Sequence, residues 1–141
     1  MRIKSFVLIE KDDHYLLIKE AAPKWDEKWF LPGGNLKKGE SPELAAIRET
    51  LEEAGCEIRL NGIIYARYYT SFFNRRLNLF YSANILGDKI KDKEDKHSLS
   101  VKWFSYDELS KLPLRQKLMD IINAYRNHKT VIPVNNFRII S

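Results

Sequence analysis

The chemistry of this chain concentrates in residues 48–56, which read Arg-Glu-Thr-Leu-Glu-Glu-Ala-Gly-Cys. Glu49, Glu52 and Glu53 fall within about one helical turn, just before Gly55, which predicts a helix C-terminus. Carboxylates at that end are repelled by the helix dipole, by about 0.3–1 kcal/mol each. The whole chain carries a net charge of +5, so overall composition does not explain the cluster. Because Mg²⁺ prefers oxygen ligands, the cluster suits a hard divalent cation.

A helical wheel separates this acidic cluster from an apolar set of residues. The three glutamates share an arc of about 100°. The opposite side is expected to be the buried face, and it carries Leu44, Ile47, Leu51 and Ala54. Arg48 lies four residues before Glu52 and offsets only part of the like-charge repulsion. A solvated acidic face on a surface helix is the alternative interpretation of the same pattern.

The segment before the helix favours the cation interpretation. Gly33 and Gly34 permit a backbone that approaches a ligand closely, and Glu40 follows after five residues. Ser41 is a good N-cap and Pro42 suits the first helical position. A glycine loop that leads into a capped helix therefore places a rigid backbone beside the three carboxylates.

The elements that must position these residues alternate between strand and helix patterns. Periods of two and apolar runs predict strands at residues 3–9, 15–19, 56–60, 63–73, 77–85 and 99–104. Helices are expected at residues 42–54 and 114–125, and residues 131–140 are expected to add a strand or to pack on the surface. Mixed strands with two main helices predict an α/β or α+β sandwich. The length of 141 residues fits one domain, 1–141.

Composition limits the classes of function. The lone Cys56 cannot form an internal disulfide, which fits a reducing compartment, and no apolar stretch approaches the roughly 18 residues of a membrane span. We therefore expect a cytoplasmic protein without a membrane partner. The positive net charge suits a phosphorylated small molecule. No basic run is long enough to indicate nucleic acid, so a nucleic-acid partner is not expected.

At this point the spacing is informative as a whole. Gly34, five residues, Glu40, seven residues and then residues 48–56 resemble the Nudix box of the MutT-like hydrolases, G-x5-E-x7-R-E-U-x-E-E-x-G-U, where U is a bulky apolar residue. Every glycine, glutamate and arginine position agrees with this pattern, whereas Thr50 and Cys56 are smaller and less apolar than the aliphatic residues usual at their positions. The resemblance implies a Nudix α/β/α sandwich with a mixed β-sheet.

The same resemblance implies hydrolysis of a nucleoside diphosphate linked to another moiety, with Mg²⁺ or in its place Mn²⁺. By position, Glu49 and Glu53 are expected to bind the metal directly, Glu52 directly or through water, and Gly33 through its carbonyl. Arg48 is expected to orient the glutamates. Gly34, Glu40 and Gly55 are expected to support the motif.

The general base stays open at this stage. In different relatives it comes from the box helix or from a carboxylate on a later loop. Glu94 lies in such a loop, beside Asp92 and Asp95. Glu49 or Glu53 is the alternative base, and an ordinary exposed loop is the alternative interpretation of Glu94.

Substrate-binding candidates come from the aromatic and basic residues between positions 65 and 76. Arg67, Tyr69, Phe73 and Arg75 are predicted to bind substrate, although alternate aromatics in a strand are more often core residues. Arg76 and Lys37 also have the reach to contact phosphates, and Trp25 and Trp29 are either core or stacking residues. A nucleoside tri- or diphosphate is the first substrate class, ahead of ADP-ribose, nucleotide sugars and dinucleoside polyphosphates.

Two further functions compete with nucleotide hydrolysis. One is a Nudix module that senses a nucleotide without cleaving it, although such modules often lose box glutamates that this chain keeps. The other is an RNA-acting Nudix enzyme. Homodimers are frequent in the family, so a homodimer is kept as an expectation.

Overall fold

The computed structural model describes residues 1–128 and 132–133. Residues 134–140, predicted to extend the tail as a strand or a surface segment, lie outside this range. In chain order the elements are β1 (Arg2–Lys11), β2 (His14–Glu20), the 3₁₀ helix η1 (Pro23–Trp25), β3 (Trp29–Phe30), β4 (Gly33–Asn35), α1 (Pro42–Ala54), β5 (Glu57–Thr70), β6 (Arg75–Leu86), β7 (Ser98–Ser105), α2 (Tyr106–Leu109), α3 (Leu118–His128) and β8 (Ile132–Pro133).

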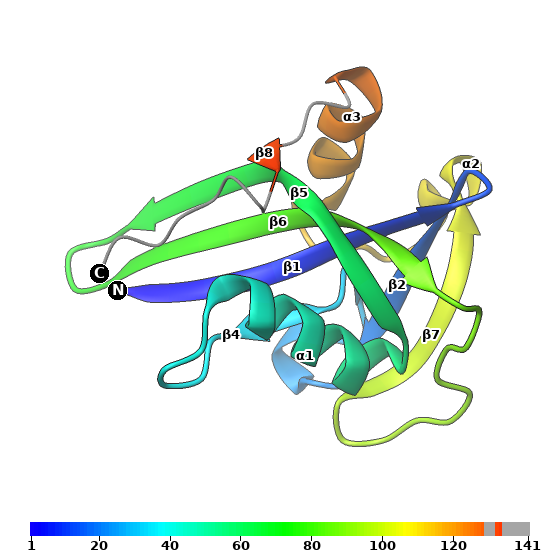
Figure 1. Ribbon diagram of the computed structural model, residues 1–141, viewed down its shortest axis with the longest axis horizontal. Helices are drawn as coiled ribbons and strands as arrows, with labels where there is room; N and C mark the ends of the chain where they lie inside the picture. Colours follow the sequence, from blue (N-terminus) through cyan, green and yellow to red (C-terminus); the bar gives the residue numbers. More distant parts are fainter. Residues whose placement is uncertain (129–131, 134–141) are drawn as a thin grey trace.

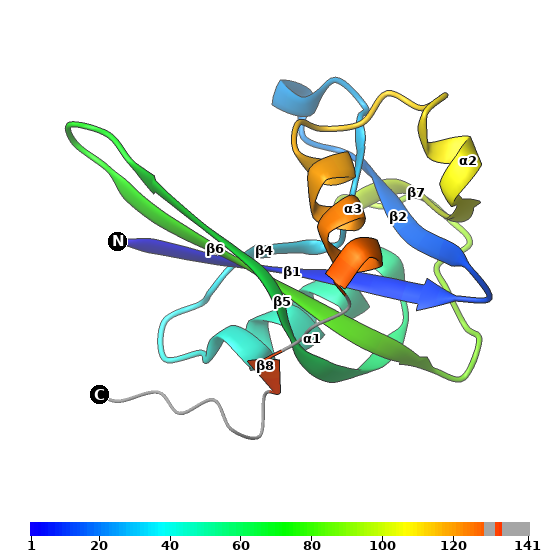
Figure 2. The same ribbon diagram turned by 90° about the horizontal axis from the view of Figure 1, so that it is seen from above.

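The described strands form one mixed sheet. Its main path is β3-β2-β1-β6-β5-β8, with β4 paired to β1 and β7 paired to β2. Strands β1 and β6 run parallel over eight residue pairs, whereas the other pairs are antiparallel. The long β5–β6 hairpin extends away from the rest of the molecule, as Figure 2 shows.

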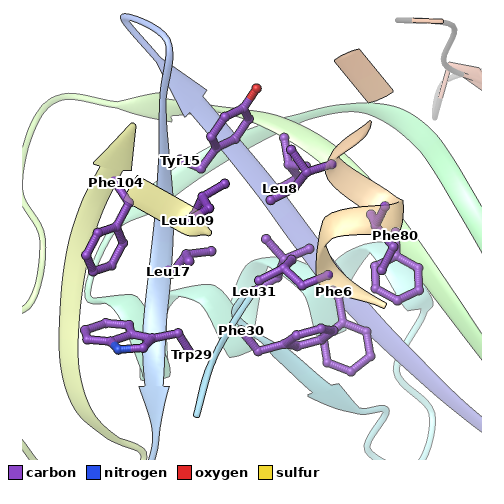
Figure 3. Packing of buried hydrophobic residues seen from close by; sticks show 13 residues of the cluster. Phe6, Leu8, Tyr15, Leu17, Trp29, Phe30, Leu31, Phe80, Phe104 and Leu109 are labelled. Atoms are coloured by element: carbon purple, nitrogen blue, oxygen red, sulfur yellow. The ribbon is translucent and has the colours of Figure 1, made fainter. Parts of the chain in front are cut away.

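The alternation of β1 side chains explains why helices cover both faces of the sheet. Phe6 and Leu8 belong to a core cluster that includes residues of α2 and α3, and Figure 3 shows part of that cluster. Val7 and Ile9 point to the opposite face and pack in a second cluster with Ala46 and Ala54 of α1. In Figure 1, α1 and α3 accordingly lie on opposite sides of the central strands. The fold is the expected α/β/α sandwich.

The prediction of the buried face of α1 is wrong for three of its four residues. Leu44, Ile47 and Leu51 are 59%, 39% and 51% exposed, and only Ala54 is buried. The side that meets the sheet is made of smaller residues, Ala45, Ala46, Thr50 and Ala54. Small side chains let the helix lie close to the strands, whose own branched residues fill the interface. A helical wheel that ranks residues by hydrophobicity alone does not predict this, because it places the large apolar residues on the buried face.

The other differences concern boundaries. The strands predicted at residues 56–60 and 63–73 form one strand, β5, with irregularities near Gly62 and Tyr65. The last helix begins at Leu118 rather than at residue 114, because Lys117 adopts a φ of 77°. Leu114 instead forms a bridge with Trp29, which is buried. In the described part of the chain, no helix combines the length and the hydropathy needed to cross a membrane.

Candidate active site

Helix α1 is fixed at its N-terminus by the expected cap. The Ser41 hydroxyl accepts a hydrogen bond from the Leu44 N–H at 3.2 Å, and Pro42 occupies the first turn. The buried Ser5 of β1 donates to the Pro42 carbonyl at 2.8 Å, which ties the helix start to the sheet. These contacts set the orientation in which the helix presents its acidic side.

The C-terminal end of α1 is compensated by groups that lie far away in the sequence. Gly55 adopts a φ of 69° and its N–H donates to the Leu51 carbonyl. The Lys91 ammonium donates to the Glu52 carbonyl at 2.6 Å, and Ser98 donates to the Glu53 carbonyl at 2.6 Å. A cation at this end favours the helix dipole, so Lys91 offsets part of the repulsion among the glutamates.

Arg48 is the centre of the charge network on α1. Its guanidinium contacts Glu40 through two nitrogens, at 2.7 and 2.8 Å, and also donates to Glu49 at 2.9 Å and Glu52 at 3.2 Å. A further bond to the Asn35 carbonyl ties the arginine to β4. Hydrogen bonds from Arg48 and from the Lys37 N–H lower the pKa of Glu40 to about 2. Glu40 and Arg48 therefore form a permanent ion pair that holds the loop against the helix.

Glu53 occupies a different environment from the other two glutamates. Its side chain is 9% exposed, and it accepts a hydrogen bond from the Gly33 N–H at 2.6 Å. Burial raises its pKa to about 9, although the Gly33 N–H opposes the shift. Burial also raises the pKa of Glu49, against the opposing effect of Arg48. Burial therefore disfavours the charged form of both carboxylates, and a cation bound beside them would offset that cost.

The two glycines of the loop leave the space that these carboxylates occupy. A Cβ on Gly34 would lie 2.9 Å from the Glu49 carboxylate. A Cβ on Gly33 would meet the Ser5 carbonyl oxygen and the Phe6 ring at distances below contact range. The glycine pair is therefore required by close approach on two sides, to the sheet and to α1.

The donor set on α1 fits a hard divalent cation. Glu49, Glu52 and Glu53, with the Gly33 carbonyl, supply oxygen donors only, which is the preference of Mg²⁺ and Mn²⁺. Within residues 1–128 and 132–133, however, no three acidic, histidine or cysteine side chains are grouped as they stand to hold an ion. Arg48 draws Glu49 and Glu52 toward itself, while Glu53 turns to Gly33. A bound cation therefore requires these side chains to turn.

The predicted base Glu94 lies apart from this network. It lines a surface hollow of about 170 Å³ with residues that include Lys93 and Lys102. In the described portion of the chain it makes no hydrogen bond or ion pair with α1. Its neighbour Asp95 has a structural role, because it accepts hydrogen bonds from Lys91 and from the His97 and Ser98 N–H groups.

The predicted substrate residues divide into two pairs. Arg67 and Tyr69 line a cavity of about 160 Å³ between the β5–β6 hairpin, η1 and the start of α3. Phe73 is 86% exposed at the hairpin turn, and Arg75 is exposed beside it. Neither of these two lines the cavity. The sheet register explains the division, because Tyr69 lies opposite Arg76, whereas Arg75 lies opposite Thr70 and on the other face.

Sequence reasoning missed several residues that shape both regions. Arg115, Lys117 and Asn78 line the cavity, and Arg115 forms a 2.6 Å ion pair with Glu20. Lys91, which compensates the end of α1, was not recognised either. No local pattern marks these residues. The one available signal was the basic run Arg115-Gln116-Lys117 just before a helix.

Comparison with known proteins identifies the family of this chain. A family model described as NUDIX domain matches residues 2–125. Putative nudix hydrolase 1 of Caenorhabditis elegans is 32% identical over 126 residues, which cover 85% of this chain and 34% of the relative. The chain thus spans about a third of that protein. A putative 8-oxo-dGTP diphosphatase of Bacillus subtilis is 32% identical over 127 residues, or 87% of this chain and 78% of the relative.

Solved structures support the same fold. The chain superposes on a NUDIX hydrolase from Nitrosomonas europaea with a TM-score of 0.83 and 26% sequence identity. That similarity covers 99% of this chain and 97% of the other. The two proteins therefore share their overall fold along almost the whole length of both chains.

Proposed function

The chain belongs to the NUDIX hydrolase family, and from that premise we propose that it hydrolyses the diphosphate bond of a nucleoside diphosphate linked to another moiety, with Mg²⁺ or Mn²⁺. The observation that carries the proposal is the acidic side of α1. There Glu49 and Glu53, both with raised pKa values, lie against the Gly33-Gly34 backbone beside the Arg48 ion pairs.

The roles of the residues follow from their contacts. Glu49, Glu52, Glu53 and the Gly33 carbonyl would hold the cation. When bound, such a cation withdraws charge from phosphoryl oxygens and lowers the pKa of a nearby water. Arg48 limits the rotation of Glu49 and Glu52, because it donates to both while Glu40 and the Asn35 carbonyl fix its own position.

The general base stays a prediction with the same alternatives as before. Glu94 is one candidate, and its exposed position leaves it free to take a proton from water. Glu49 or Glu53 is the other, because both lie on the box helix beside the expected metal site.

The first substrate class to test is a nucleoside tri- or diphosphate, as the name of the Bacillus relative suggests. ADP-ribose, nucleotide sugars and dinucleoside polyphosphates follow. A hydrolysis screen over these compounds, with and without Mg²⁺ and with identification of both products, tests the proposal. Cleavage that depends on the cation is the expected result. Nucleotide binding without cleavage would instead favour the sensing module.

Four further expectations belong to this proposal. They are a single domain over residues 1–141, a cytoplasmic location, a homodimer and the absence of a nucleic-acid partner. Sedimentation measurements test the homodimer. RNA affinity with a steep dependence on salt would contradict the last expectation.

A further inference from the structure

The cavity beside the β5–β6 hairpin is built mainly from cations and aromatic rings. Its volume is about 160 Å³. The basic residues that line it are Arg67, Arg76, Arg115 and Lys117. The aromatic residues that line it are Trp25, Phe30, Tyr69 and Phe80.

Strand register assembles the hairpin wall of the cavity. Arg67 of β5 lies opposite Asn78 of β6, and Tyr69 lies opposite Arg76. Residues two apart on one strand share a face, so these four side chains project to the same side of the hairpin. The wall therefore depends on pairing between two strands and not on a continuous stretch of sequence.

Guanidinium groups already lie against the aromatic rings of this cavity. Arg67 and Arg76 lie 4.8 and 4.4 Å from the centre of the Tyr69 ring. Arg115 lies 3.5 Å from the centre of the Trp25 ring and 4.2 Å from that of Phe30. The rings thus hold the arginines in place by cation–π contact. A neutral nucleobase would have to displace them in order to stack on those same ring faces.

The cations of the cavity have little negative charge near them. Arg115 is paired with Glu20 and Lys117 is 3.9 Å from Asp120, but over the described residues neither Arg67 nor Arg76 has a carboxylate within 4.0 Å. The Arg76 Nε and the Asn78 amide oxygen are buried, and neither has a hydrogen-bond partner among the described residues. The excess of positive charge also affects Lys4. Its pKa is lowered chiefly by burial and further by the charges of Arg76 and Arg115.

Only a thin layer separates this cavity from the acidic side of α1. Glu53 accepts from the Gly33 N–H, and Gly33 packs against the Phe6 ring. The Phe6 ring stacks on Phe80 with centroids 5.1 Å apart and meets Phe30 edge-on at 5.2 Å. Figure 3 shows the three side chains near one another. Phe30 and Phe80 line the cavity. A short chain of contacts through Gly33 and Phe6 therefore links the two regions.

We propose that the cavity binds a phosphate ester on the nucleoside of the cleaved diphosphate, so that the preferred substrate carries an additional phosphate group on its nucleoside. The planar guanidinium groups of Arg67 and Arg76 match phosphate oxygens through paired N–H donors, and such charge-assisted bonds are strong. Asn78 presents its amide beside them. This inference rests on the proposed diphosphate hydrolysis and names a property of its substrate.

Matched substrates that differ by one phosphate test the inference. The pairs are ADP-ribose 2′-phosphate with ADP-ribose, and coenzyme A with dephospho-coenzyme A, each with Mg²⁺. The phosphorylated member of at least one pair is expected to have a kcat/KM about tenfold higher. Equal or slower turnover of the phosphorylated member in both pairs would overturn the inference.

Variants on β5 and β6 locate the effect. Arg67→Gln and Arg76→Gln are each expected to lower the kcat/KM of the phosphorylated member about tenfold more than the kcat/KM of the unphosphorylated member. Arg59→Gln is the matched control, because it removes the same charge from an exposed position on β5 outside the cavity. An equal loss for both members of a pair would assign the arginines to general stability and would contradict the inference.

Calorimetry separates this inference from the proposed hydrolysis. In EDTA, adenosine 2′,5′-bisphosphate or its 3′,5′ isomer is expected to bind about tenfold tighter than adenosine 5′-monophosphate, and Arg76→Gln is expected to abolish the difference. If no substrate were cleaved with Mg²⁺, the hydrolysis proposal would fail. The comparison of these affinities would still show whether the cavity binds the additional phosphate group. Equal affinity of the three compounds would overturn the cavity inference alone.

Discussion

The acidic side of α1 and the basic cavity beside the β5–β6 hairpin carry opposite charges, and their charged side chains have different partners. On α1 one arginine, Arg48, contacts three carboxylates, so most charges there already have a partner. In the cavity Arg67 and Arg76 lie against aromatic rings, with no carboxylate within 4.0 Å over the described residues. The first region has surplus negative charge that calls for a cation, and the second has surplus positive charge that calls for an anion.

The difference bears on the proposal that one substrate binds to both surfaces. A cation–diphosphate complex suits the acidic side, whereas a bare anionic group suits the cavity. The acidic side is held by ion pairs that a bound cation would have to rearrange. The cavity arginines Arg67 and Arg76 are held by cation–π contacts, and over the described residues their guanidinium groups have no carboxylate partner. Each region can therefore be altered separately, and the following substitutions test how independent they are.

Glu53→Gln is expected to have the largest effect. Removal of this carboxylate charge should lower kcat at least about 100-fold, the scale of losing a principal electrostatic stabiliser. The variant should stay folded, because its neutral amide replaces a carboxylate whose pKa burial already raises. Steady-state kinetics with Mg²⁺ and thermal unfolding measure the two effects. Glu43→Gln, in the first turn of α1, is the control, and near-normal turnover of Glu53→Gln would refute the assigned role.

Arg115→Gln tests an ion pair that joins the cavity to β2. Arg115 and Glu20 have side chains only 13% and 11% exposed, so loss of the arginine leaves a largely buried carboxylate without its partner. The free energy of unfolding should fall by about 2–3 kcal/mol, as measured by urea denaturation. The double variant with Glu20→Gln should recover part of the loss. Equal stability of the single variant and the wild type would show that this pair is not structural.

Gly34→Ala tests the packing of the acidic side. The added Cβ would lie 2.9 Å from the Glu49 carboxylate, which must then shift. We expect the Mg²⁺ concentration for half-maximal activity to rise about tenfold, because a displaced ligand weakens the site. Binding of adenosine bisphosphates in EDTA should stay unchanged, since the cavity does not include this loop. An unchanged Mg²⁺ dependence would show that Glu49 does not need the space beside Gly34 in order to bind the metal.

Asp95→Asn should have the smallest effect, and that effect depends on pH. Hydrogen bonds from Lys91 and the His97 N–H lower the pKa of Asp95 to about 2. The folded state therefore gains stability from Asp95 above the unfolded pKa of about 4, and the gain is lost as the pH falls through about 2. The melting temperature of Asp95→Asn should lie below that of the wild type at pH 7, and the two should converge toward pH 2. A difference that grew in acid would contradict this assignment.

The sequence predicted the acidic region better than the basic one for a physical reason. Glu40, Arg48 and the three glutamates lie on one loop and one helix, so their spacing along the chain is close to their spacing in space. The cavity draws on η1, β5, β6 and the segment before α3, which only the folded sheet brings together. Arg67 and Tyr69 were named, but Arg115 and Asn78 were not, because nothing in their neighbourhoods indicates a shared site.

The fold was predicted in its class and in most of its elements, while the packing of α1 was not. The helix limits from Pro42 to Ala54 followed from the caps and were confirmed. The prediction of the buried face was wrong because the side of α1 that packs on the sheet carries small residues such as Ala46 and Thr50. Larger side chains at these positions would hold the helix farther from the strands. Lys91 also escaped prediction, since its contact with the Glu52 carbonyl spans 39 residues.

Helix α1 leaves little freedom for evolutionary change. One side accepts only small residues, a second carries the charged network, and just the third, with Leu44, Ile47 and Leu51, faces solvent. Saturation mutagenesis of residues 42–54 should consequently find that polar replacements are tolerated only at those three positions and at Glu43. Natural variation along this helix is expected to follow the same periodic pattern, and drift at its outward positions is expected to be fast.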